Sequence, residues 1–158
     1  MNPTVSTVSE DGDLYKFTLS GINVSLANAI RRTILSDIPT LAFDAENKEH
    51  CQIEKNTGRL HNEILKHRLC CIPIHMNELD VLPGNYVMEL DKHNDGDNMI
   101  YITTEDFKIK NKTTNNYLTA EETRNIFPPS LKTNMFLDFA RLRSKIGPTI
   151  PGEHIKLT

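Results

Sequence analysis

Residues 23–44, NVSLANAIRRTILSDIPTLAFD, contain the strongest helical pattern of the chain. Asn23 can cap a helix because its side-chain oxygen can accept a hydrogen bond from a free N–H of the first turn, and Pro39 cannot continue the helix. Apolar residues recur between them at the spacing of one helix face: Leu26, Ala27, Ile30, Ile34 and Ile38. The pattern predicts an amphipathic helix over residues 23–38 that contributes to a hydrophobic core.

The other side of this predicted helix is polar. Asn28, Arg32 and Ser36 follow at intervals of four, and Arg31 lies at the margin of the apolar stripe. Successive residues of a helix point about 100° apart, so the two arginines would reach in different directions. Taken alone, these residues are typical of a solvated helix face.

A second stretch, residues 53–74, reads IEKNTGRLHNEILKHRLCCIPI and predicts a helix over residues 58–69. Asn56 or Thr57 would cap it, and Leu60 and Ile64 would form its apolar side. The remaining side is polar: Glu63, Lys66, His67 and Arg68.

The rest of the chain predicts short strands and one short helix. The first ten residues are polar and are expected to be loose, whereas residues 15–19 alternate as in a strand. Residues 86–90 and 99–103 are expected to form a hairpin around a solvated turn. Thr119 and Glu122 form a capping box for a short helix that Phe127 and two prolines close. Strands at residues 107–109, 135–143 and 153–157 complete an α+β fold in which strands predominate.

Composition excludes disordered, collagen-like and coiled-coil proteins. The 158 residues are 38% hydrophobic and 25% charged, which is enough to form a globular core. A net charge of −3 disfavours a free-standing nucleic-acid-binding module, because such binding depends on neutralising phosphates. We expect an intracellular, soluble protein, since the chain has neither a bilayer-spanning apolar run nor a secretory signal.

The cysteines allow two interpretations. Cys51, Cys70 and Cys71 lie near His61, His67 and His75, which would suit a small metal-dependent or thiol enzyme. The apolar residues around the cysteines favour buried, reduced thiols instead, and no phosphate-binding or hydrolase motif accompanies them. We therefore expect no metal, no cofactor and no catalytic residue in this chain.

The two quoted segments together closely resemble the family of RNA polymerase assembly subunits. This family includes the archaeal D-type polymerase subunit, the third-largest subunit of eukaryotic RNA polymerase II and, more distantly, the N-terminal domain of the bacterial alpha subunit. TTEDFKI at residues 103–109 and IPGEHIKL at residues 150–157 are similar to archaeal, eukaryotic and giant-virus members. Some relatives carry a cysteine cluster for iron–sulfur or zinc, but here no cysteine follows Cys71.

The resemblance implies a discontinuous dimerisation domain with an inserted, mostly antiparallel β-rich domain. Residues 1–50 would be the first segment of the dimerisation domain, and residues 51–158 would be the insert. In the family, the chain then returns to complete the dimerisation domain. The resemblance therefore implies that this sequence is a fragment, the product of a split gene or a partial sequence.

The implied function is that of a non-catalytic platform subunit of a DNA-directed RNA polymerase. Its expected partners are a smaller homologous subunit, of the eleventh type or like the archaeal L-type subunit, and the second-largest and largest subunits. Small zinc-binding polymerase subunits are further candidates, whereas no direct specific nucleic-acid contact and no membrane are expected. The compartment would be the nucleus, the archaeal cytoplasm or, for a giant-virus member, the viral factory or virion. The expected partner-binding residues are Asn28, Arg31, Arg32, Ser36, Glu63, His67 and Arg68.

Overall fold

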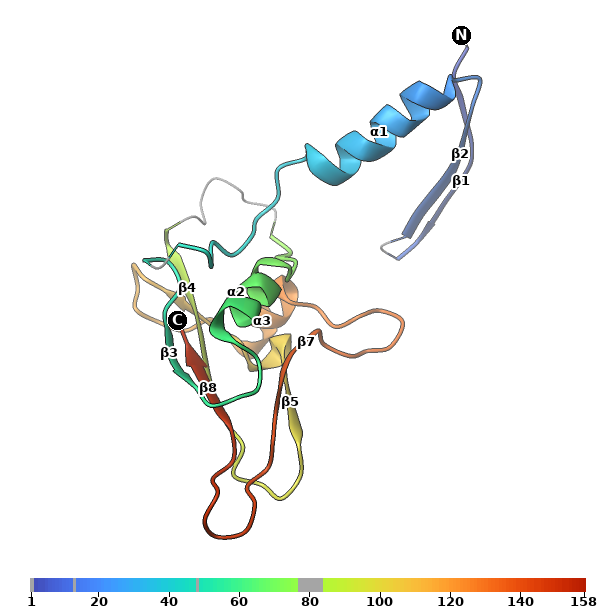
Figure 1. Ribbon diagram of the computed structural model, residues 1–158. Coiled ribbons are helices and arrows are strands. Elements are labelled where there is room, and N and C mark those ends of the chain that lie inside the picture. The colour runs from blue at the N-terminus through green and yellow to red at the C-terminus, as the bar shows by residue number, and fades with distance from the viewer. Residues whose placement is uncertain (1, 13, 48, 77–83) are drawn as a thin grey trace. The chain divides into compact units, whose positions relative to one another are not determined.

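The computed structural model describes residues 2–12, 14–47, 49–76 and 84–158, and combines helices with antiparallel strands in an α+β fold (Figure 1). The chain divides into two compact units, Met1–Thr40 and Leu41–Thr158, called here the first and second unit. This division concerns packing within the chain. The assignment of residues 1–50 and 51–158 to two family domains remains a prediction.

The first unit begins with a hairpin of β1 (Thr4–Asp11) and β2 (Leu14–Ser20), paired antiparallel. The prediction that the first ten residues are loose is therefore wrong. Polar residues can form this hairpin because both strands are almost entirely exposed to solvent. Hydroxyl groups also hydrogen-bond across the strands, as between Thr4 and Ser20, whose side-chain oxygens lie 2.7 Å apart. Gly21 follows with φ of +70°, and a Cβ there would lie 2.1 Å from the carbonyl oxygen of Asn2.

Helix α1 (Val24–Ser36) confirms the helical pattern and its cap. The Asn23 side chain accepts a hydrogen bond from the Ser25 N–H at 2.8 Å. The helix ends at Ser36, two residues earlier than predicted, where the Asp37 N–H donates to the carbonyl of Thr33 at 2.9 Å. The expectation that α1 contributes to a core is wrong for this chain, because none of its residues, all of which are described, is buried.

The second unit contains a four-stranded antiparallel sheet in the order β3-β8-β4-β6 and a two-stranded sheet of β5 and β7. The strands are β3 (Ile53–Asn56), β4 (Tyr86–His93), β5 (Ile100–Thr103), β6 (Lys108–Asn111), β7 (Asp138–Leu142) and β8 (His154–Leu157). The expected hairpin of residues 86–90 and 99–103 is wrong. Strand β4 runs on to His93 and pairs with β6 and β8, while β5 pairs with β7.

Helix α2 (Asn62–Cys70) begins four residues later than predicted. Asn56 does not cap it, because its side chain accepts from the Gly58 N–H and donates to the Leu60 carbonyl, which holds a turn before the helix. The predicted apolar side is wrong for Ile64, which is exposed, and Leu60 packs against the core but precedes the helix. The buried residues of α2 are Leu65 and Leu69.

Two shorter elements follow, the 3-10 helix η1 (Thr104–Asp106) and α3 (Ala120–Ile126). The capping box of α3 is confirmed, because Thr119 and Glu122 exchange side-chain and backbone hydrogen bonds.

The hydrophobic core lies in the second unit, where helices α2 and α3 pack with the sheets. Its centre is aromatic: the Phe107 ring meets those of Phe127 and Phe139 edge-on, with centroids 5.5 and 5.6 Å away. Within the described part of the chain, no helix has the length and apolar character needed to cross a membrane.

Candidate protein-interaction site

The apolar stripe of α1, formed by Leu26, Ala27, Ile30 and Ile34, is open to solvent within this chain. Ile30, at the middle of the stripe, is 45% exposed, and Leu26 and Ile34 are exposed as well. An exposed apolar face of this extent is typical of a surface that another protein covers. The hairpin of the same unit adds exposed apolar side chains, including Val5, Tyr15 and Phe17.

The polar face of α1 carries four of the predicted partner-binding residues. Arg31 donates from Nε and from a terminal nitrogen to the Asn28 side-chain oxygen, at 3.2 and 2.8 Å. Ser36 donates to the backbone carbonyl of Arg32 at 2.8 Å. Among the described residues, the Arg32 guanidinium has no hydrogen-bond or ion-pair partner. Asn28 therefore orients Arg31, while Arg32 is free to meet a ligand group.

The other three predicted residues lie on α2, in the second unit. Glu63 and His67 are exposed. Arg68 instead donates to two backbone carbonyls of β7, those of Phe139 at 2.7 Å and Asp138 at 2.9 Å. His67 and Arg68 also line a small cavity of about 360 Å³ with Cys71. The structure thus brings Asn28 close to Arg31 and His67 close to Arg68, and it gives Arg68 a structural role.

The cysteines differ in exposure, so the expectation of buried thiols holds only in part. Cys51 is buried, Cys70 is intermediate and Cys71 is exposed. Burial raises the pKa of the Cys51 thiol above its ordinary value, and the charge of Lys66 lowers it in part. Within residues 2–12, 14–47, 49–76 and 84–158, no group of three His, Cys, Asp or Glu side chains is placed to hold a metal ion.

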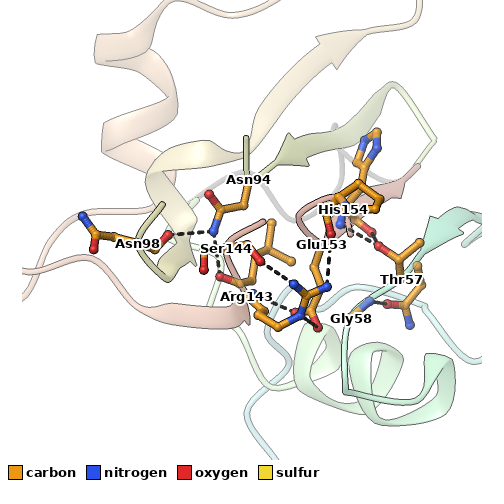
Figure 2. A network of polar contacts seen from close by, with 11 residues as sticks. Thr57, Gly58, Asn94, Asn98, Arg143, Ser144, Glu153 and His154 are labelled. Atoms are coloured by element: carbon orange, nitrogen blue, oxygen red, sulfur yellow. Dashed lines mark hydrogen bonds and ion pairs between the residues drawn. The ribbon is translucent and has the colours of Figure 1, made fainter. Parts of the chain in front are cut away.

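A buried polar network joins the end of β4 to the segment between β7 and β8 (Figure 2). The Asn94 side chain, 1% exposed, donates to the carbonyls of Asn98 and Leu142 at 2.9 and 3.0 Å, and accepts from the Gly96 N–H. Glu153, 5% exposed, accepts from the Arg143 N–H at 2.7 Å and lies 3.6 Å from Arg143 Nε. These bonds fix the backbone beside a cleft.

That cleft was not predicted from the sequence. It has a volume of about 610 Å³, and its walls carry Arg59, Tyr101, Arg141 and Arg143 besides Arg68. These residues come from segments far apart in the chain, so no local motif indicates them. The one signal in the sequence is the pair of arginines at positions 141 and 143, and strand pairing places Arg141 opposite Tyr101.

Comparison with known proteins gives one family and a consistent set of relatives. Residues 16–135 match the family described as the RNA polymerase Rpb3/Rpb11 dimerisation domain. The chain is 36% identical over 102 residues to DNA-directed RNA polymerase subunit Rpo3 of Pyrococcus furiosus, covering 61% of this chain and 37% of that protein. It is 39% identical over 74 residues to the human DNA-directed RNA polymerases I and III subunit RPAC1, covering 47% of this chain and 20% of the relative.

A plant protein extends the set. The chain is 42% identical over 62 residues to subunit 3 of DNA-directed RNA polymerases II, IV and V of Arabidopsis thaliana, covering 39% of this chain and 18% of the relative. The matched region thus spans less than two fifths of each of these three curated relatives.

Proposed function

Because this chain belongs to the RNA polymerase Rpb3/Rpb11 dimerisation-domain family, we propose that it acts as a non-catalytic assembly subunit of a DNA-directed RNA polymerase. Its relatives are named as polymerase subunits, which supports this role over that of a small Cys/His enzyme. In this proposal the chain first pairs with a smaller homologous subunit. The pair then docks the second-largest subunit, and the largest subunit follows.

The observation that carries the proposal is the exposed apolar stripe of α1. Helix α1 is capped and has a periodic apolar face, yet none of its residues is buried within this chain. Such a face is typical of a helix that packs against another protein. Burying the exposed half of one Leu or Ile side chain would contribute roughly 1 kcal/mol, so several such residues together can hold a partner. We assign this stripe to the smaller homologous subunit.

The opposite face of α1 suits a second protein. Arg31 and Arg32 can each bind a carboxylate with two parallel hydrogen bonds, and arginine is enriched at protein interfaces. We assign this face to the second-largest subunit. In the same proposal, residues 1–50 are the first segment of the dimerisation domain and residues 51–158 are the insert.

The experiment measures pairing of the chain with the smaller homologous subunit of the same polymerase by size-exclusion chromatography with light scattering. Ile30→Asp should leave α1 folded in the isolated chain, because the side chain is 45% exposed. It should weaken pairing by about 30-fold or more, since the complex would bury an unpaired charge.

The matched control is Ala29→Asp, which adds the same charge to the polar side of α1 and should pair like the wild type. Circular dichroism checks the helix content of both variants. Wild-type pairing of the Ile30→Asp variant would contradict the assignment of the stripe, and equal loss with Ala29→Asp would contradict its restriction to one face.

A further inference from the structure

The cleft of about 610 Å³ in the second unit is lined by more positively than negatively charged side chains. It is bounded by the loop before α2, by α2 itself, and by β5, β7 and the segment that follows β7. Its charged lining residues are four arginines and two acids: Arg59, Arg68, Arg141, Arg143, Asp138 and Glu153. We call it the arginine cleft.

The charges of the arginine cleft are unequally neutralised. The buried Glu153 carboxylate lies 3.6 Å from Arg143 Nε, so this pair is satisfied within the chain. Arg68 donates to backbone carbonyls, which carry no net charge, and it keeps its own charge. Among the described residues, neither Arg59 nor Arg141 has a carboxylate partner. Asp138 is the other acid of the lining, so the open part of the cleft keeps a net positive charge.

The cleft also has an apolar rim. Met99 is 52% exposed and Tyr101 is 46% exposed, and both line the cleft. Tyr101 and Arg141 are cross-strand partners of β5 and β7, and the Arg141 guanidinium carbon lies 5.7 Å from the centre of the Tyr101 ring. This stacking holds the Arg141 guanidinium beside the rim, so that an apolar contact and a charged contact are available together.

We propose that the arginine cleft binds an acidic segment of a protein partner. Carboxylates of that segment would bind Arg59 and Arg141, and an apolar side chain between them would pack on Met99 and Tyr101. The guanidinium fork matches a carboxylate in shape and charge, and Arg, Tyr and Met are residue types enriched at protein interfaces.

A protein segment fits these observations better than a nucleic acid. Nucleic-acid binding needs positive charge spread along a phosphate backbone, whereas this chain carries a net charge of −3 and its cleft contains Asp138 and Glu153. The cleft lies wholly in the second unit, so the proposal goes beyond the pairing role of α1 and does not depend on it.

The test measures binding of a fluorescein-labelled peptide to the 158-residue chain by fluorescence anisotropy. The peptide consists of Asp and Glu with Leu and Phe interspersed. One comparison peptide replaces every acid by its amide, and a single-stranded DNA oligonucleotide of equal formal charge serves as the second comparison. We expect the acidic peptide to bind more tightly than either comparison.

Variants locate the binding. The double variant Arg59→Ala and Arg141→Ala removes two exposed side chains and should weaken binding of the acidic peptide by roughly tenfold or more. The matched control is Arg124→Ala, which removes an arginine that stacks on Phe136 elsewhere in the second unit and should change binding by less than about twofold.

Chemical modification of arginines in the wild-type chain tests the same site without depending on how the variants fold. Phenylglyoxal should modify Arg59 and Arg141 in the free chain, and the acidic peptide should protect both while leaving Arg124 reactive. Equal binding of the amide peptide, tighter binding of the oligonucleotide, absence of binding, or unprotected Arg59 and Arg141 would each overturn the proposal.

Discussion

The guanidinium of Arg68, on α2, donates a hydrogen bond from Nε to the backbone carbonyl of Phe139, on β7, at 2.7 Å. A terminal nitrogen of the same guanidinium donates to the neighbouring carbonyl of Asp138. Phe139 is completely buried, so this pair of bonds ties α2 to the strand that carries the centre of the core. One residue thus connects segments 71 positions apart.

Arg68→Ala should therefore destabilise the second unit. The loss of two charge-assisted hydrogen bonds, one of them exposed, should lower the free energy of unfolding by about 1–2 kcal/mol. Urea unfolding followed by circular dichroism measures it. Arg68→Lys, which can replace only one of the bonds, should fall between the wild type and the alanine variant. An unchanged midpoint for Arg68→Ala would show that α2 is held by its apolar contacts alone.

Gly152→Ala should be among the most damaging single substitutions. A Cβ at this position would lie 1.6 Å from the carbonyl oxygen of Asn94, and backbone cannot move aside as a flexible side chain can. We expect a loss of about 3 kcal/mol in the free energy of unfolding. Gly147→Ala is the control: its Cβ meets nothing within 4 Å, and only the left-handed backbone, with φ of +59°, costs about 1 kcal/mol. Similar thermal midpoints for the two variants would contradict this packing.

Asn94→Asp should destabilise the polar network of Figure 2. The Asn94 amide nitrogen donates to two carbonyl oxygens, and a carboxylate there would face both without a proton. An unpaired buried charge should cost about 3 kcal/mol at pH 7, and lowering the pH should restore part of it by protonating the introduced carboxylate. Asn98→Asp should be nearly neutral, because only the backbone carbonyl of Asn98 takes part. Equal stability of both variants in thermal melts would refute the network.

The cysteines should react with iodoacetamide in order of exposure. Cys71 is exposed and should react first, whereas Cys51 is buried and should react roughly 100-fold more slowly, because access requires local opening. Burial also raises the pKa of the Cys51 thiol, so its reactive thiolate is scarce at neutral pH. Peptide mass spectrometry at increasing times gives the order, and modification of Cys51 before Cys71 would contradict the fold.

The raised pKa of the Cys51 thiol also determines how the stability of the fold depends on pH. A thiol whose pKa is raised in the folded state keeps its proton there when the unfolded chain has lost it. The stability that the protonated Cys51 thiol contributes is complete below about pH 8.5, the pKa of an exposed cysteine, and declines as the pH rises through the folded-state pKa. Cys51→Ala should remove this decline in unfolding experiments between neutral and alkaline pH. A decline that persists unchanged in the variant would assign it to another group.

Local signals in the sequence predicted the helices best. The cap at Asn23 and the capping box at Thr119 act within one helical turn, so residues next to each other in the chain determine them. Strand partners are set by distant residues instead. Asp91 of β4 pairs with Lys156 of β8, more than sixty residues later, and nothing in the sequence near β4 indicates this partner. The hairpin prediction failed for this reason.

The candidate interaction surfaces show the same contrast. Periodicity located the apolar stripe of α1, but it could not tell a core face from a face left open, because both have the same pattern. Arg68 was predicted to bind a partner, and its bonds to β7 depend on pairing that the sequence does not reveal. The arginine cleft combines distant segments and was missed for that reason.

The most direct test of the assembly role is retention of the second-largest polymerase subunit by the pair formed from this chain and the smaller homologous subunit. The double variant Arg31→Ala and Arg32→Ala should fold and pair like the wild type, because both side chains are exposed on the polar face of α1. It should bind the second-largest subunit about 30-fold more weakly, since partner carboxylates would lose their arginines, while Arg124→Ala should bind normally. Retention of the second-largest subunit by the double variant at the wild-type level would contradict the account.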